Sequence, residues 1–127
     1  ITAGEFARAE SLLRSFLDSS TNQASRGNAL VNLVRSLLRQ RRFDEAAEVG
    51  EEAYSTMPDE FLAGYNLAVA LAWLGNRERF EEIATHIRRL HCDGWMRDVV
   101  ETDSENLAAK IGYSPSEFVT AFVPNTN

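Results

Sequence analysis

The stretch that decides the fold is GNALVNLVRSLLRQRRFDEAAEVGEEAYSTMPDE, residues 27–60. Apolar residues recur in it every three or four positions, which places them on one face of a helix. Ala46 and Ala53 lie on the apolar face of the second half, and such small residues let two helices approach to about 8–10 Å. The stretch therefore predicts a pair of antiparallel helices, Asn28–Arg39 and Asp44–Thr56.

Helical periodicity extends over the rest of the chain, and no segment alternates apolar and polar residues for long enough to predict a strand. Gly75 is expected to end a helix in the left-handed conformation. Ser114, Pro115 and Glu117 have the spacing of a strong helix start. We therefore expect an all-α fold. Further helices are expected over Glu5–Asp18, from a cap at Asp59 to Leu74, over Phe80–Leu90, within Cys92–Glu101, from a cap at Asp103 or Ser104 to Ile111, and from Ser114 onward.

Composition narrows the classes of function. The chain has 19 acidic and 13 basic residues and a net charge of −6, which disfavours nucleic acid and anionic membranes as partners. Its single cysteine, Cys92, excludes an internal disulfide and is typical of a reducing compartment, so we expect a cytoplasmic protein. The longest uncharged run, Phe61–Asn76, is shorter than the about 20 residues that a membrane-spanning helix needs.

An internal repeat links the central stretch to the next one. A shift of 34 residues aligns four identical pairs, Ala29 with Ala63, Asn32 with Asn66, Leu33 with Leu67, and Leu37 with Leu71. With this period, with Phe43 at the turn between the helices and Pro58 at its end, residues 27–60 resemble one unit of the tetratricopeptide repeat (TPR) family. The resemblance implies a solenoid in which antiparallel helix pairs stack into a superhelix.

The resemblance covers about residues 3–90, within a repeat region of residues 1–92, and it is uneven. Residues 27–60 form one unit, residues 61–91 form a unit stretched by the insertion Arg77–Arg79, and residues 3–20 look like half a unit. Leu30 and Val34 stand where the family usually has Trp and Gly. A generic antiparallel helical array is the alternative architecture.

In the TPR family, the first helix of each unit lines a concave groove that binds another protein. The matching positions here are Asn28, Val31, Asn32, Arg35 and Arg39 in one unit and Leu62, Tyr65, Asn66, Val69 and Trp73 in the next. The resemblance implies that Asn32 and Asn66 bind the main chain of an extended peptide, since an amide offers both a donor and an acceptor. The alternatives are that these amides stabilise the helix pair or face water, and that Trp73 packs at the repeat junction.

Arg35 and Arg39 lie four residues apart on one helix face, where they can meet a carboxylate of the partner. The family's specialised carboxylate clamp is not expected, because Leu62 and Asn66 replace its basic residues. We therefore expect a non-catalytic interaction module, an adaptor or scaffold that binds a peptide or helix. Association of copies through the exposed edge of the terminal half unit is left open.

Residues 93–127 depart from the repeat and are expected to form a helical hairpin that caps it. The segment from Leu107 to Phe122 also resembles a helix-turn-helix of the arabinose-regulator type. The alternative function is therefore a regulatory or sensory segment of a larger transcription regulator with a degenerate helix-turn-helix. Its second helix has no Lys or Arg, which disfavours DNA contact.

Chemistry-bearing residues are few. His86 and His91 are five residues apart and diverge on a helix, so we expect no metal site. Cys92 has no visible third partner for nucleophilic catalysis. No glycine-rich phosphate loop is present in the sequence. We therefore expect neither a cofactor nor an enzymatic activity.

Overall fold

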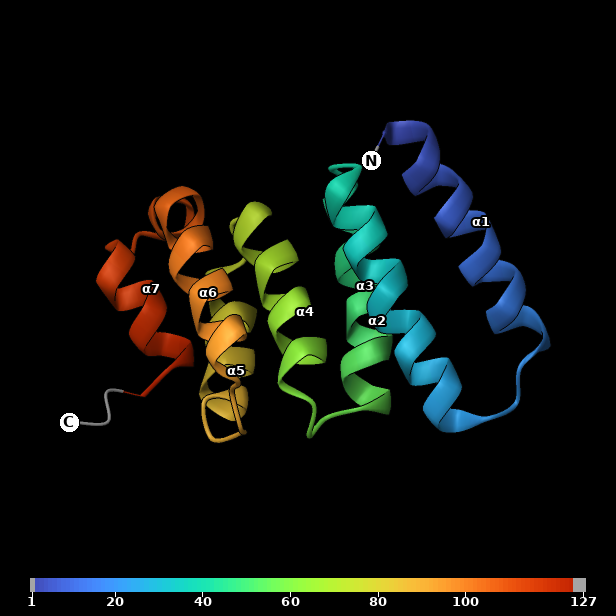
Figure 1. The fold of residues 1–127 in the computed structure, drawn as a ribbon. Helices are drawn as coiled ribbons and strands as arrows, with labels where there is room; N and C mark the ends of the chain where they lie inside the picture. The colour runs from blue at the N-terminus through green and yellow to red at the C-terminus, as the bar shows by residue number, and fades with distance from the viewer. Residues whose placement is uncertain (1, 125–127) are drawn as a thin grey trace.

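The structure is a computed structural model that describes residues 2–124. Those residues form seven α-helices and one 3₁₀-helix and no strand, which confirms the all-α prediction. The helices lie in an array from α1 at one end to α7 at the other, and α2, α4 and α6 run in the same direction (Figure 1). Their bounds are α1 Ala3–Ser19, α2 Gln23–Arg39, α3 Phe43–Thr56, α4 Phe61–Trp73, α5 Arg77–Ile87, α6 Gly94–Leu107, η1 Ala108–Ile111 and α7 Pro115–Phe122.

Two buried apolar clusters hold the array together. The first cluster joins α2, α3 and α4, and Ala46 and Ala53 of α3 are fully buried in it. The second cluster joins α4 to α5, α6, η1 and α7. Because α4 packs into both clusters, nearly all of its side chains are buried. This position explains why the uncharged run of the sequence coincides with α4.

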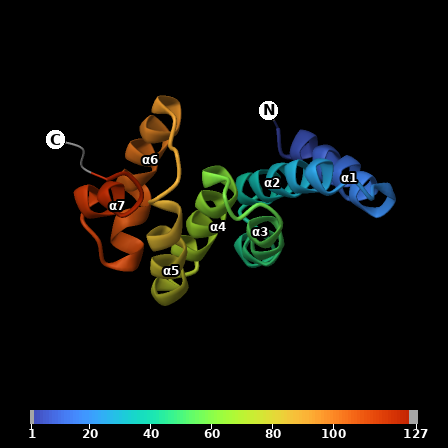
Figure 2. The ribbon, with the colours of Figure 1, turned by 90° about the horizontal axis from the view of Figure 1, so that it is seen from below.

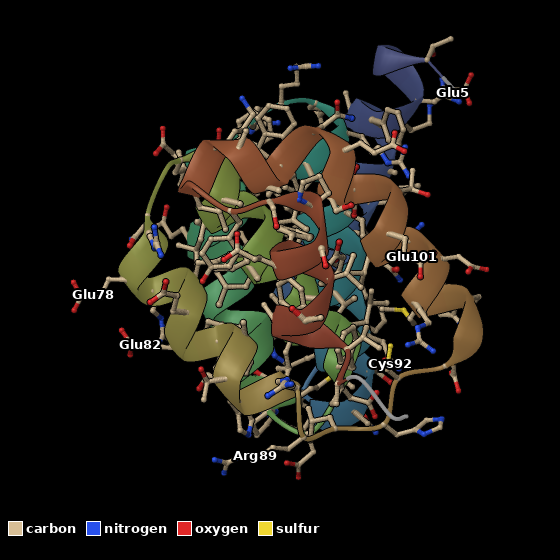
Figure 3. All side chains as sticks on the ribbon, turned by 90° about the vertical axis from the view of Figure 1, so that its left-hand side faces the viewer. Glu5, Glu78, Glu82, Arg89, Cys92 and Glu101 are labelled. Atoms are coloured by element: carbon tan, nitrogen blue, oxygen red, sulfur yellow. The ribbon has the colours of Figure 1, made fainter. Side chains whose placement is uncertain are left out.

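The C-terminal helices close one end of the second cluster. Phe118 and Phe122 of α7 are fully buried and pack against Phe80 of α5, with ring centroids 5.8 and 5.3 Å apart. Charged side chains on the outside of α5, among them Glu78 and Glu82, point away from the protein (Figure 3). The amphipathic pattern of α5 therefore places its aromatic residue inward and its acids in solvent.

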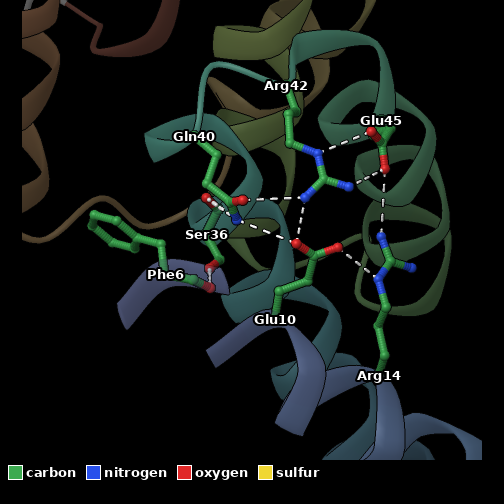
Figure 4. Close-up of polar contacts among 7 residues, drawn as sticks. All are labelled: Phe6, Glu10, Arg14, Ser36, Gln40, Arg42 and Glu45. Carbon is green, nitrogen blue, oxygen red and sulfur yellow. Dashed lines mark hydrogen bonds and ion pairs between the residues drawn. The ribbon is translucent and has the colours of Figure 1, made fainter. Parts of the chain in front are cut away.

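Helix α1 is attached to α2 and α3 by polar contacts (Figure 4). The Glu10 side chain is only 12% exposed and binds Arg42, Arg14 and Gln40. Burial raises the pKa of Glu10, but the hydrogen bonds from these partners outweigh it and lower the pKa overall. The Ser36 hydroxyl donates to the carbonyl oxygen of Phe6 at 3.0 Å, which fixes α1 along α2.

Several predicted helix ends are confirmed. Gly75 and Gly112 follow helices with φ of +73° and +75°, in the left-handed region that favours glycine. Ser114 and Glu117 form a capping box: the Glu117 N–H donates to the Ser114 hydroxyl at 3.1 Å, and the Ser114 N–H donates to Glu117 Oε1 at 2.9 Å.

Three predicted boundaries around α4 and α5 are wrong, one of them the end of α5, which lies at Ile87 instead of Leu90. Glu60, not Asp59, precedes α4, and its side chain makes no capping hydrogen bond. Arg77–Arg79, expected as an insertion between helices, form the first turn of α5. The cause is Asn76, whose side-chain oxygen accepts a hydrogen bond from the Arg79 N–H at 3.2 Å and so starts the helix earlier.

The predicted break within the segment 92–111 is also wrong. Helix α6 continues through Asp103 and Ser104, and neither residue caps a new helix. Asp103 accepts a hydrogen bond from the Tyr65 hydroxyl at 2.6 Å, and the Ser104 hydroxyl donates to the carbonyl oxygen of Glu101, also at 2.6 Å. Both side chains are therefore engaged in contacts that a continuous helix permits.

Candidate binding groove

Most of the residues predicted to line the groove meet around one cavity of about 320 Å³, here called the central cavity. It lies between α2, α4 and α6, and Figure 2 shows α6 on one side of α4 and α2 on the other. Its lining residues are Arg35, Leu38 and Arg39 of α2, Leu62, Tyr65, Asn66, Val69 and Trp73 of α4, and Trp95, Met96, Val99 and Asp103 of α6.

Asn32 lines a neighbouring cavity of about 470 Å³ between α1 and α2, here called the α1–α2 cavity. Arg35 and Arg39 line both cavities, so the two hollows adjoin. Asn28 is exposed and lines neither cavity. Val31 lines neither cavity either, and it belongs to the buried cluster of α2, α3 and α4.

Asn66 is the unusual polar residue of the central cavity. It is 6% exposed, and its Nδ2 is the one buried side-chain polar atom among residues 2–124 that has no hydrogen-bond partner. A buried donor without an acceptor costs about 1–3 kcal/mol of folding free energy. Asn66 thus lines the cavity and carries an unused donor, whereas the equivalent Asn32 is exposed to solvent.

Tyr65 and Asp103 join the two walls of the central cavity. The Tyr65 hydroxyl of α4 donates to Asp103 Oδ2 of α6 at 2.6 Å. Burial raises the pKa of Tyr65, and the nearby Asp103 carboxylate raises it further. Burial also raises the pKa of Asp103, although the Tyr65 hydrogen bond and the charge of Arg39 act in the opposite direction. This contact fixes α6 against α4.

Trp73 lines the central cavity and also packs at the junction of helices. Its ring stacks on Phe43 at the start of α3, with centroids 4.8 Å apart and planes 7° from parallel. Lys110 Nζ lies 4.4 Å and the Arg41 guanidinium carbon 5.5 Å from the centroid of the ring, where cation–π attraction is favourable. Trp73 thus lines the central cavity with part of its side chain and packs at the helix junction with the rest.

The wall formed by α6 is missing from the sequence-based prediction. Trp95 and Val99 are 58% and 38% exposed although they are large and apolar. With Asp103 they are spaced by four residues, which places all three on one face of α6. That spacing was the available signal, and the incorrect helix break at Asp103 concealed it.

The residue types that could bind a metal ion do not gather at one place in the part of the chain described. Residues 2–124 contain no group of three His, Cys, Asp or Glu side chains that could hold a metal ion. Burial raises the pKa of the Cys92 thiol, and the adjacent Asp93 carboxylate raises it further, so the reactive thiolate is disfavoured.

None of the helices within residues 2–124 combines the length and the apolar character needed to cross a membrane. No family model matches the sequence, and neither a curated protein nor a solved structure matches it.

Proposed function

We propose that this chain is a non-catalytic interaction module of the TPR type that binds a short segment of another protein in the central and α1–α2 cavities. In this proposal α2–α3 and α4–α5 are successive helix pairs of a solenoid. Supporting it, α2 and α4 run in the same direction, and α3 and α5 lie on the side opposite α6 (Figures 1 and 2). The period of 34 residues that relates α2 to α4 supports it independently.

The observation that carries the proposal is the unused donor of Asn66. A peptide carbonyl in the central cavity would accept a hydrogen bond from Nδ2 and remove the cost of leaving this donor unpaired. Such a bond is made to the main chain, so it does not depend on the side chains of the partner. Asn32 offers a second amide to the same peptide from the adjoining cavity.

The walls of the central cavity suit an apolar side chain of the bound segment. Leu62 and Val69 of α4 face Met96 of α6 across it. Trp95 stands exposed at the rim, and a large exposed aromatic residue beside a hollow is typical of the residues that dominate binding energy. An apolar anchor and a main-chain hydrogen bond together define a site for a peptide.

The test uses twelve-residue peptides selected from a random displayed library against the wild-type chain. For the variant Asn66→Leu, we expect two opposite effects. The free protein gains up to about 1–3 kcal/mol of unfolding free energy, because an unpaired buried donor is removed. The selected peptides bind about two- to twelvefold more weakly, since one hydrogen bond contributes about 0.5–1.5 kcal/mol. Urea unfolding and calorimetry measure the two quantities.

Asn106→Leu is the matched control, because Asn106 is an exposed amide on α6 that lies outside the cavities. It should change neither quantity. If the library yields no peptide that binds the folded chain, or if Asn66→Leu binds the selected peptides as tightly as wild type, the proposed function is wrong.

A further inference from the structure

We propose that the bound segment is a linear peptide with an acidic residue, an apolar centre and a basic residue in that order along the groove. The acidic residue lies against Arg35 and Arg39, and the basic residue lies against Asp59 and Glu60. This inference rests on the proposed function and specifies the chemistry of the partner.

The basic end of the groove is formed by two arginines that are free to bind. Arg35 and Arg39 are exposed, and within residues 2–124 neither forms an ion pair, whereas five other arginines do. The charge of Arg39 acts on Asp103, but that carboxylate already accepts the Tyr65 hydrogen bond. Two guanidinium groups at the junction of the two cavities favour a carboxylate of the partner.

The acidic end is a third cavity of about 360 Å³, here called the entrance cavity, at the start of α4 and α6. It shares Leu62, Trp95 and Met96 with the central cavity, so the two hollows adjoin. Asp59 and Glu60 line it, and neither has an ion-pair partner within the described chain. The third acid, Asp93, is bound by His91 at 2.7 Å.

The order of charges along the groove follows from the direction of the helices. Because α2 and α4 run in the same direction, the arginines near the end of α2 lie beside the end of α4, far from the acids at its start (Figure 1). From Glu60 to Val69 the axis of α4 rises about 14 Å. An extended chain covers this distance in about four residues, so we expect the two partner charges to be about four residues apart.

The charges discriminate between partners rather than supplying most of the affinity. Ion pairs at an exposed rim change binding by about two- to fivefold each. Like charges brought together disfavour the wrong peptide. A peptide with acids at both ends would meet Asp59 and Glu60, and one with bases at both ends would meet the two arginines. A peptide with an acid at one end and a base at the other avoids both repulsions.

The experiment starts from the twelve-residue peptides selected with the wild-type chain. We expect the selected sequences to share an acid and a base about four residues apart, with apolar residues between them. Synthetic versions that replace the acid by Lys or the base by Glu should bind at least about fivefold more weakly at low salt. The double variant Arg35→Ser/Arg39→Ser should lose the preference for the acid, and Asp59→Ser/Glu60→Ser the preference for the base.

Arg88→Ser/Arg89→Ser is the matched control, because it removes the same charge from exposed arginines that line none of the three groove cavities. It should leave both preferences unchanged. Selected peptides that bind through Asn66 but show no preference for either charge would overturn this inference and leave the proposed function standing. A preference that survives in the two groove variants would overturn it as well.

Discussion

We expect the stability of the groove to depend on pH through Asp103. Burial raises its pKa above the value in the unfolded chain, despite the Tyr65 hydrogen bond and the Arg39 charge. Folding therefore favours the protonated carboxyl. Its favourable contribution to stability is fully present below the unfolded pKa and is lost as the pH rises through the folded pKa. As the pH rises, ionisation of Asp103 therefore lowers the stability of the folded protein.

We therefore expect Asp103→Asn to change the free energy of unfolding, relative to wild type, in the stabilising direction more at pH 7 than at pH 4. The Asn oxygen still accepts from the Tyr65 hydroxyl, so the contact itself is retained. Urea unfolding at the two pH values measures the difference. The pKa of Glu10 is lowered, so its contribution to the unfolding free energy is lost on acidification. This loss is the same in both proteins and cancels in the comparison. Asp98→Asn on the exposed side of α6 is the control, and a stability difference that grows toward acid would contradict the prediction.

Single residues can be placed on a helix face from the sequence. The resemblance assigns Arg35, Asn66 and Val69 to the groove-facing side of their helices, and all three line the central cavity. Val31 shares that sequence pattern but is buried. Periodicity places a residue on a face of its helix, and it does not say which neighbouring helix covers that face. Asp103 was missed for the same reason, because its partner Tyr65 is 38 residues away.

At the scale of elements, the approach of α4 to α5 depends on Gly64. A Cβ at this position would lie 2.4 Å from the Ile87 Cγ2 atom, which is closer than packed side chains allow. Ile87 is fully buried and β-branched, so its side chain cannot easily turn away. The glycine therefore sets how closely the two helices pack.

Gly64→Ala should destabilise the protein by about 1–3 kcal/mol, the usual cost of overpacking a core. The loss would appear even though Ala is favoured over Gly in a helix by up to about 1 kcal/mol. Gly94→Ala in α6 is the matched control, since a Cβ there meets nothing within 4 Å. Thermal unfolding of both variants decides the point: a Gly64→Ala protein as stable as wild type would show that the helices can separate without cost.

The elements themselves were largely predictable, and their ends were less so. Helix α2 ends at Arg39 and α3 ends at Thr56, as the apolar spacing predicts. The errors occur where side-chain contacts compete for a cap, as with Asn76 at the start of α5. A capping residue is recognised by its hydrogen bond, and several Asp, Ser and Asn residues near a boundary offer the same bond in the sequence.

At the scale of the whole molecule, packing is local along the chain. The cluster of α2, α3 and α4 contains no buried residue of α5, α6 or α7, and the second cluster contains none of α2 or α3. Helix α4 is the element that both clusters share. In a stack of this kind, stability approximates a sum of units and of contacts between neighbours. A defect at one end should therefore weaken that end most.

Phe118→Ala tests this expectation. Phe118 is fully buried, its ring packs against Phe80 and Phe122, and its removal should cost about 3–5 kcal/mol of unfolding free energy. Hydrogen exchange should then increase most in α5 and α7, while α2 and α3 retain most of their protection, because their cluster is untouched. Leu33→Ala, at a fully buried site of the first cluster, should give the reverse pattern. If protection falls equally in all helices for both variants, the chain unfolds as one cooperative unit. Helix α4 would then couple the two clusters too strongly for either end to open alone.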